Sequence, residues 1–166
     1  MMLDSLRPVE AISVLKCLQA VGHDTAYFGF TKSGETTNPA RNTARNLQWA
    51  FGYDKGPIVL FIFYPYIKTE DGQVVYEVDF RGWLQTFAGK PKGLVNVNLV
   101  ERHVQKAFET GDSVRLVLVS GEEMNQNGNK VSKVLLRKPD LNPWHVHSYS
   151  DRDRTARLVR SQSPVG

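Results

Sequence analysis

The chain has only one cysteine, Cys17, among its 166 residues. One cysteine cannot form an internal disulfide or supply a multi-cysteine zinc site, so both are excluded. No run of about 18 apolar residues occurs, and the first residues lack the apolar region of a signal peptide. We therefore expect a cytoplasmic protein with no membrane partner. Cys17 falls within a helical pattern, which predicts a buried and unreactive thiol.

Motifs that identify common enzymes are also missing. The sequence holds no GxSxG or GxGxxG signature, and the basic loop 89–93 lacks the GxxxxGK[ST] spacing of a nucleotide-binding loop. Glu77 and Asp79 do not stand in the D…ExK order of metal-dependent nucleases. We predict no cofactor and no catalytic activity of the chain's own.

The composition is that of one globular domain, with 41% hydrophobic and 23% charged residues. The net charge is +4 and the sequence pI is about 9.2, which suits a nucleic-acid partner. Many basic proteins bind nothing acidic, so the charge alone does not decide the function.

The hydrophobic pattern predicts an α+β domain over residues 1–150, with a mainly antiparallel sheet of about five strands and three helices. A continuous apolar run at 57–64 indicates a buried central strand, and alternation at 74–80 indicates a strand joined antiparallel to it by a long hairpin. The remaining strands are expected at 113–120, 131–137 and 144–149, and the helices at 8–21, 38–51 and 98–109. Residues 151–166 read as a basic, partly disordered tail.

The most informative stretch is residues 38–51. Asn38 can cap a helix, Pro39 fits its first position, and an apolar stripe that includes Ala44 and Leu47 follows. The opposite face carries polar side chains and one indole: Arg41, Asn42, Arg45, Asn46, Gln48 and Trp49. The alternative is that another segment covers this face and Trp49 belongs to the core.

These residue types predict DNA contacts. Arginine suits phosphates, asparagine and glutamine suit base edges, and tryptophan can stack or wedge. The polar loop 32–37 leads into this stretch and could wrap a ligand on the same side. Further phosphate contacts are predicted from four more basic residues, Lys90, Lys92, Arg152 and Arg154, if the fold brings them together. The alternative is a solvated charged surface.

His145 and His147 form the clearest candidate metal pair. Side chains two apart on a strand share a face, so both imidazoles could reach one ion, with Asp79 or Asp140 as a third ligand. A small metal-dependent enzyme is therefore an alternative function. His103 lies on an apolar helical stripe, which predicts a core histidine rather than a ligand.

The C-terminal half carries one resemblance, over residues 114–149. Its strand Val114–Val119, the returning Val134–Arg137, and the cluster Asp140, Trp144–Val146 and Tyr149 resemble DNA-sensing domains that precede HNH nucleases in modification-dependent restriction proteins. The resemblance implies recognition of modified bases, with cleavage left to a nuclease partner chain or domain. Our leading hypothesis is a domain that binds duplex DNA, and a third is a protein-interaction module anchored by Trp49.

Overall fold

The computed structural model describes residues 3–126 and 129–161, together with all their side chains except those of Tyr53 and residues 122–134. The fold is α+β, as predicted. A mixed sheet of eight strands is described rather than about five antiparallel ones, with four α-helices rather than three. Among the described residues, no helix combines the length and the apolar character needed to cross a membrane.

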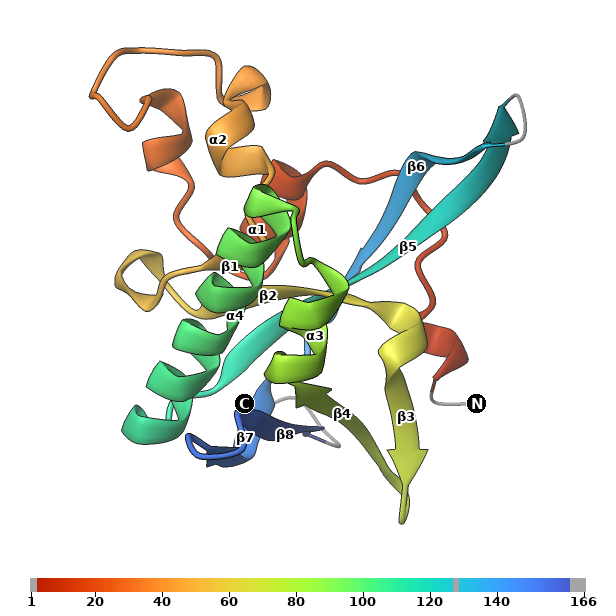
Figure 1. Ribbon diagram of the computed structural model, residues 1–166. Helices are drawn as coiled ribbons and strands as arrows, with labels where there is room; N and C mark the ends of the chain where they lie inside the picture. Colours follow the sequence, from red (N-terminus) through yellow and green to blue (C-terminus); the bar gives the residue numbers. More distant parts are fainter. Residues whose placement is uncertain (1–2, 127–128, 162–166) are drawn as a thin grey trace.

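The strands are arranged in the order β1-β2-β5-β7-β8-β4-β3, and β6 pairs with β5 (Figure 1). β2 and β5 run parallel, and the other pairs are antiparallel. The strand bounds are β1 Ala50–Phe51, β2 Ile58–Phe63, β3 Ile67–Glu70, β4 Gln73–Asp79, β5 Val114–Gln126, β6 Asn129–Pro139, β7 Trp144–Ser150 and β8 Thr155–Arg160. The helices are α1 Val14–Ala20, α2 Thr43–Asn46, α3 Phe80–Thr86 and α4 Pro91–Thr110, and the 3-10 turns are η1 Asp4–Leu6, η2 Ala26–Gly29, η3 Pro39–Arg41, η4 Tyr53–Lys55 and η5 Tyr64–Tyr66.

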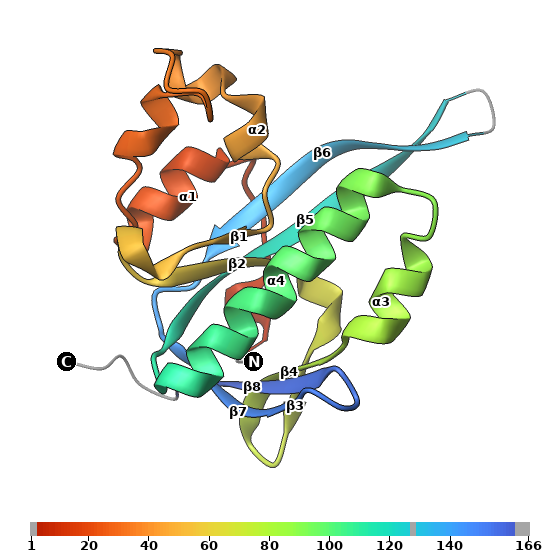
Figure 2. The ribbon, with the colours of Figure 1, turned by 60° about the vertical axis from the view of Figure 1, so that its left-hand side comes forward.

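The apolar run of β2 is buried on both faces because two hydrophobic clusters enclose it. Alternate strand residues point to opposite faces. Leu60 and Ile62 therefore join the cluster under α3 and α4, whereas Val59 and Phe61 join the cluster formed with α1. Figure 2 shows α4 crossing one face of the sheet with α3 beside it.

α4 is the longest helix and confirms the helical pattern expected at 98–109, extended at both ends. Pro91 occupies its first turn, and Gly111 ends it with a φ of 76°, a left-handed conformation that suits glycine. Val97, Val100 and Val104 are fully buried against the sheet. The same helix carries Asn96 and Lys92 on its other sides, which matters for the site below.

Cys17 is buried on α1, as predicted, and burial raises the pKa of its thiol to about 11. α1 is shorter than the expected helix at 8–21 because Ser13 caps it, accepting a hydrogen bond from the backbone N–H of Lys16. Residues 26–29 after α1 form the 3-10 turn η2, and Phe30 then makes an isolated β-bridge with Thr36.

The expected hairpin between 57–64 and 74–80 is wrong. The chain leaves β2 through η5, and the short strand β3 pairs with β4 instead. Asp71 and Gly72 join them with φ values of 51° and 77°, as a two-residue hairpin turn requires. β4 joins the rest of the sheet by pairing antiparallel with β8.

The tail expected from residue 151 is also wrong for its first part, since Thr155–Arg160 form β8 between β7 and β4. Ala156 and Leu158 are buried in the core, with Arg157 between them. Arg160 pairs with buried Asp140, which also accepts a 2.8 Å hydrogen bond from the Trp144 indole N–H. The boundary at residue 150 therefore does not hold, and residues 162–166 lie outside the described part.

The continuous helix expected at 38–51 is wrong, although its cap is confirmed. Asn38 accepts from the N–H of Ala40, and Pro39 follows. The helix then breaks at Asn42, whose ψ of 83° is not helical and whose amide donates to the carbonyls of Phe28 and Phe30. Only α2 is helical beyond this point, and Ala50–Phe51 pair with β2 as β1. Burial of Asn42 and strand pairing outweigh the local helical pattern.

Candidate nucleic-acid interface

Three hollows surround the segment Thr43–Gly52, and Gln48 contributes to all of them. Figure 1 shows α2 directly above the N-terminal end of α4. The segment predicted to carry the function therefore lies at the centre of the candidate site, although its fold differs from the prediction.

The largest of the three hollows is a groove of about 470 Å³ between α2 and α4, which we call the α2–α4 groove. Lys32 and Lys92 line it, and none of the described residues that line it is acidic. Leu47 and Val95 are 58% and 67% exposed, so apolar surface lies beside the ammonium groups. The full lining is Lys32, Thr43, Ala44, Leu47, Gln48, Pro91, Lys92, Val95, Asn96 and Leu99.

Asn96 holds the two sides of this groove together. Its side-chain oxygen accepts a 3.1 Å hydrogen bond from the backbone N–H of Trp49, and its amide donates to the carbonyl of Leu47 at 3.2 Å. The segment after α2 is thereby fixed to α4 by one side chain.

An apolar pocket of about 210 Å³, which we call the tryptophan pocket, adjoins the groove. The indole of Trp49 stacks on that of Trp83, with centroids 5.6 Å apart and planes 24° apart, and meets Phe87 edge-on at 5.3 Å. The lining is Val14, Asn46, Leu47, Gln48, Trp49, Phe61, Phe63, Trp83, Val119, Leu135 and Arg137. Trp49 is half-buried and packs against the core, so it does not point freely outward as the predicted binding face required.

The predicted base-reading amides are largely occupied elsewhere. Asn42 is buried by its two bonds to backbone carbonyls, and Asn46 donates to the carbonyls of Pro39 and Asn42. Both amide groups therefore stabilise the local fold and do not serve as the predicted base contacts. The Gln48 side chain has no hydrogen-bond partner among the described residues and faces the hollows.

The basic side chains divide into separate groups. Arg41 is exposed on η3, while the Arg45 guanidinium lies 5.1 Å from the centre of the Tyr27 ring and lines another hollow than the groove. Lys90 is exposed at the start of α4, 6.0 Å from the Phe87 ring, and Lys92 lines the groove. The single shared face expected for these groups is not formed.

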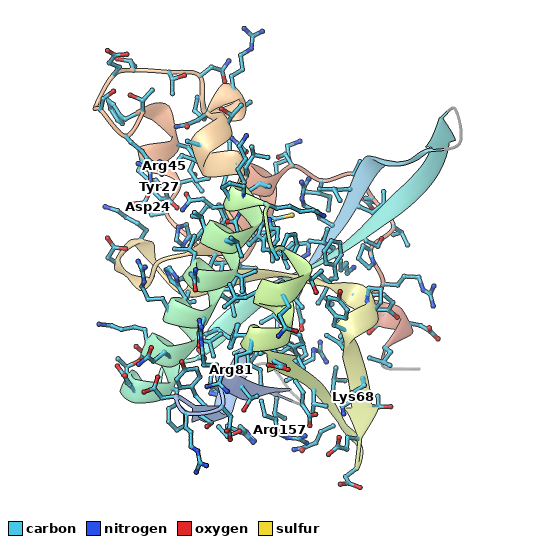
Figure 3. All side chains as sticks on the ribbon, in the orientation of Figure 1. Asp24, Tyr27, Arg45, Lys68, Arg81 and Arg157 are labelled. Atoms are coloured by element: carbon cyan, nitrogen blue, oxygen red, sulfur yellow. The ribbon has the colours of Figure 1, made fainter. Side chains whose placement is uncertain are left out.

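Arg152 and Arg154 lie at the opposite end of the molecule, in the turn between β7 and β8 (Figure 1). Arg152 is exposed, and its carbonyl accepts from the Arg81 guanidinium. Arg154 forms an ion pair with buried Glu101 on α4. Figure 3 shows Arg81 far from Arg45 and Tyr27. This separation removes Arg152 and Arg154 from a common site with α2.

The candidate metal pair is not supported by the strand geometry. The register between β7 and β8 shifts between Val146 and Ser148, which places His147 at a bulge and interrupts the alternation that would align it with His145. Asp79 caps α3, and Asp140 holds Arg160 and Trp144. No group of three or more potential metal ligands occurs in the part of the chain that the structure describes.

His103 is half-buried, and its Nδ1 lies 2.7 Å from the carbonyl of Leu99, a group that only accepts. Nδ1 therefore carries the proton. The ring also lines the third of the three hollows, together with Gly52 and Asp54. The expected core histidine is thus partly open to a cavity.

Sequence reasoning missed several residues of the site. Lys32 belongs to the polar loop that was expected to wrap a ligand, and the groove now includes it. Nothing in the sequence pairs Asn96 with residues 47–49, or Trp83 with Trp49, because these contacts depend on tertiary packing.

Scans against models of known protein families, curated proteins and solved structures found no match.

Proposed function

We propose that this protein is a DNA-binding domain whose α2–α4 groove receives the phosphate backbone of duplex DNA. The observation that carries the proposal is the groove's charge: two lysines, from the 32–37 loop and from α4, line it, and none of the described lining residues is acidic. Lysine and amide side chains are the usual partners of phosphate oxygens. The excess of basic residues over the whole chain agrees with this.

The tryptophan pocket supplies the second half of the proposal, base recognition. Its volume of about 210 Å³ and its aromatic wall suit one planar base, held by stacking against an indole. Gln48 borders both hollows and can donate to or accept from a base edge. The pocket is thus the place where a modified base would be distinguished from an unmodified one.

A gel-shift titration tests the DNA-binding half. The wild type should shift duplex DNA at about 50 mM salt and bind much more weakly at about 200 mM, because phosphate contacts release counterions. Lys92→Gln should weaken binding to every sequence, and Arg152→Gln, with the same charge change at the other end of the molecule, should not. Absence of a shift at low salt would overturn the proposal.

The base-recognition half needs a different comparison. Trp49→Ala should reduce discrimination between duplexes with and without a modified base while leaving the salt dependence intact. Equal affinity of the wild type for modified and unmodified duplexes would remove the modified-base part and leave DNA binding standing.

A further inference from the structure

The third hollow, which we call the Arg45 pocket, lies between the β1 end of the segment and α4. It has a volume of about 200 Å³ and is lined by Tyr27, Arg45, Gln48, Ala50, Phe51, Gly52, Asp54, Lys55 and His103. Typical pockets for drug-sized ligands hold about 300–1,000 Å³. The Arg45 pocket therefore suits a small polar group better than a whole cofactor.

Arg45 is the unusual residue of this pocket. Its guanidinium is held by the face of Tyr27, 5.1 Å from the ring centre, and pairs with no carboxylate among the described residues. Its Nε is buried without a hydrogen-bond partner in the same part of the chain. Because Nε is enclosed by the protein, the guanidinium meets the pocket through its two outer nitrogens, which also form no hydrogen bond with the described residues.

Tyr27 is itself fixed, which fixes the position of the guanidinium. The carbonyl of Pro57 lies 3.2 Å from His23 Nδ1 and can only accept, so Nδ1 carries the proton. Nε2 therefore accepts a 2.7 Å bond from the Tyr27 hydroxyl. The hydroxyl proton is committed to His23, and the ring remains as a platform for Arg45; Figure 3 shows Tyr27 and Arg45 adjacent.

The remaining walls give the pocket a positive balance. Lys55 adds a second cation against one carboxylate, Asp54. A Cβ placed on Gly52 would lie 3.0 Å from Asp54 Oδ1 and 3.5 Å from His103 Nε2. Gly52 therefore keeps open the space between these groups, and a larger residue there would fill it.

We propose that the Arg45 pocket binds a phosphate group, as inorganic phosphate or as the terminal phosphate of a small ester. A planar guanidinium can donate two parallel hydrogen bonds to phosphate oxygens, and an ammonium adds a point charge. The outer nitrogens of the Arg45 guanidinium supply these donors, and Lys55 supplies the point charge. This site shares only Gln48 with the described lining of the α2–α4 groove, and phosphate binding there does not depend on DNA binding.

Isothermal titration of the full chain with inorganic phosphate tests the proposal, with adenosine monophosphate in a second arm. Wild type should bind phosphate, and Arg45→Gln should bind at least about tenfold more weakly, because it loses charge-assisted hydrogen bonds to the phosphate oxygens. Gly52→Leu should also lose binding although it changes no charge. Arg152→Gln, a matched charge change remote from the pocket, should bind like the wild type.

The two arms separate the sources of the phosphate. Tighter binding of the nucleotide than of inorganic phosphate would assign the site to an ester, and equal binding would assign it to phosphate alone. No heat with either probe up to about 10 mM, or equal affinity of wild type and Arg45→Gln, would overturn the proposal. If Gly52→Leu does not fold, Lys55→Gln provides the second reduction in affinity. Phosphate titration uses no DNA, so its result and that of the gel shift can fail independently.

Discussion

The side-chain oxygen of Asn96 accepts a hydrogen bond from the backbone N–H of Trp49, 47 residues earlier in the chain, at 3.1 Å. The same amide donates to the carbonyl of Leu47 at 3.2 Å. One side chain of α4 thus satisfies two backbone groups of an irregular segment that could not satisfy them by itself. The α2–α4 groove and the tryptophan pocket both depend on this attachment.

Asn96→Ala should therefore loosen the segment after α2. Two lost hydrogen bonds, with backbone groups left behind, should lower the free energy of unfolding by about 1–3 kcal/mol. Urea denaturation measures this change, and hydrogen exchange should show faster exchange at the Trp49 amide.

Asn98→Ala is the matched control for this variant, since the one side-chain hydrogen bond that Asn98 makes with the described residues is exposed and comes from Arg154 at 3.3 Å. Its stability should stay within about 0.5 kcal/mol of wild type. Equal losses in the two variants would show that Asn96 has no special attachment role.

The ion pair between Glu101 and Arg154 predicts an acid-sensitive stability. Burial acts to raise the pKa of the Glu101 carboxyl, but hydrogen bonds from Arg154 and Tyr149 outweigh it, and the pKa falls below its usual 4.5. A carboxyl with a depressed folded pKa stabilises the fold above its unfolded pKa, and this stabilisation is lost as the pH falls below about 4.5. Urea denaturation across that range should show the loss.

Glu101→Gln should remove that part of the pH dependence and cost about 2–4 kcal/mol at neutral pH, because Arg154 loses its buried partner. Glu109→Gln, an exposed change on the same helix, controls for altered net charge. A wild-type stability that does not change below pH 4.5 would contradict the assigned ion pair.

His23 predicts a second and separate pH window. Burial lowers the pKa of its imidazole below 6.5, against the opposing effect of the Pro57 carbonyl. A base with a lowered folded pKa binds its proton less readily when folded, so stability should fall as the pH drops through 6.5. Protonation would also put an N–H where Nε2 now accepts from Tyr27.

His23→Gln should flatten the stability profile just below pH 6.5 while leaving the loss below 4.5 unchanged. His147→Gln is the control, since that imidazole is exposed. If His147→Gln flattens the profile equally, His23 is not the group that titrates.

An element of this fold could be predicted where its own residues determine it, and not where distant contacts do. The runs that became β2, β5 and the later part of α4 are recognisable because their apolar periods match one type of element and their burial agrees. Residues 155–160 were missed because four arginines at 152–160 read as solvated chain, whereas Arg157 pairs with Glu70 and Arg160 with Asp140 only after the strands assemble.

The site was predictable only in its location. Residues 38–51 did turn out to border all three hollows, yet the expected outward helix assumed that Asn42 and Trp49 were free. The Asn42 amide instead donates to the carbonyls of Phe28, in η2, and of Phe30, which follows η2. Trp49 stacks on Trp83, 34 residues later in the chain. Such contacts override helix propensity and cannot be read from spacing.

The salt dependence of DNA binding tests the central claim most directly. Affinity for one duplex should be measured by fluorescence anisotropy over a range of salt concentrations for the wild type, for Lys32→Ala/Lys92→Ala and for Arg152→Ala. A plot of log affinity against log salt concentration falls with a slope of about −0.9 per phosphate contact. The groove variant should therefore bind more weakly, with a slope smaller in magnitude by about 2, whereas Arg152→Ala should match the wild type. Identical slopes for the wild type and the groove variant, or no binding at the lowest salt, would contradict the account.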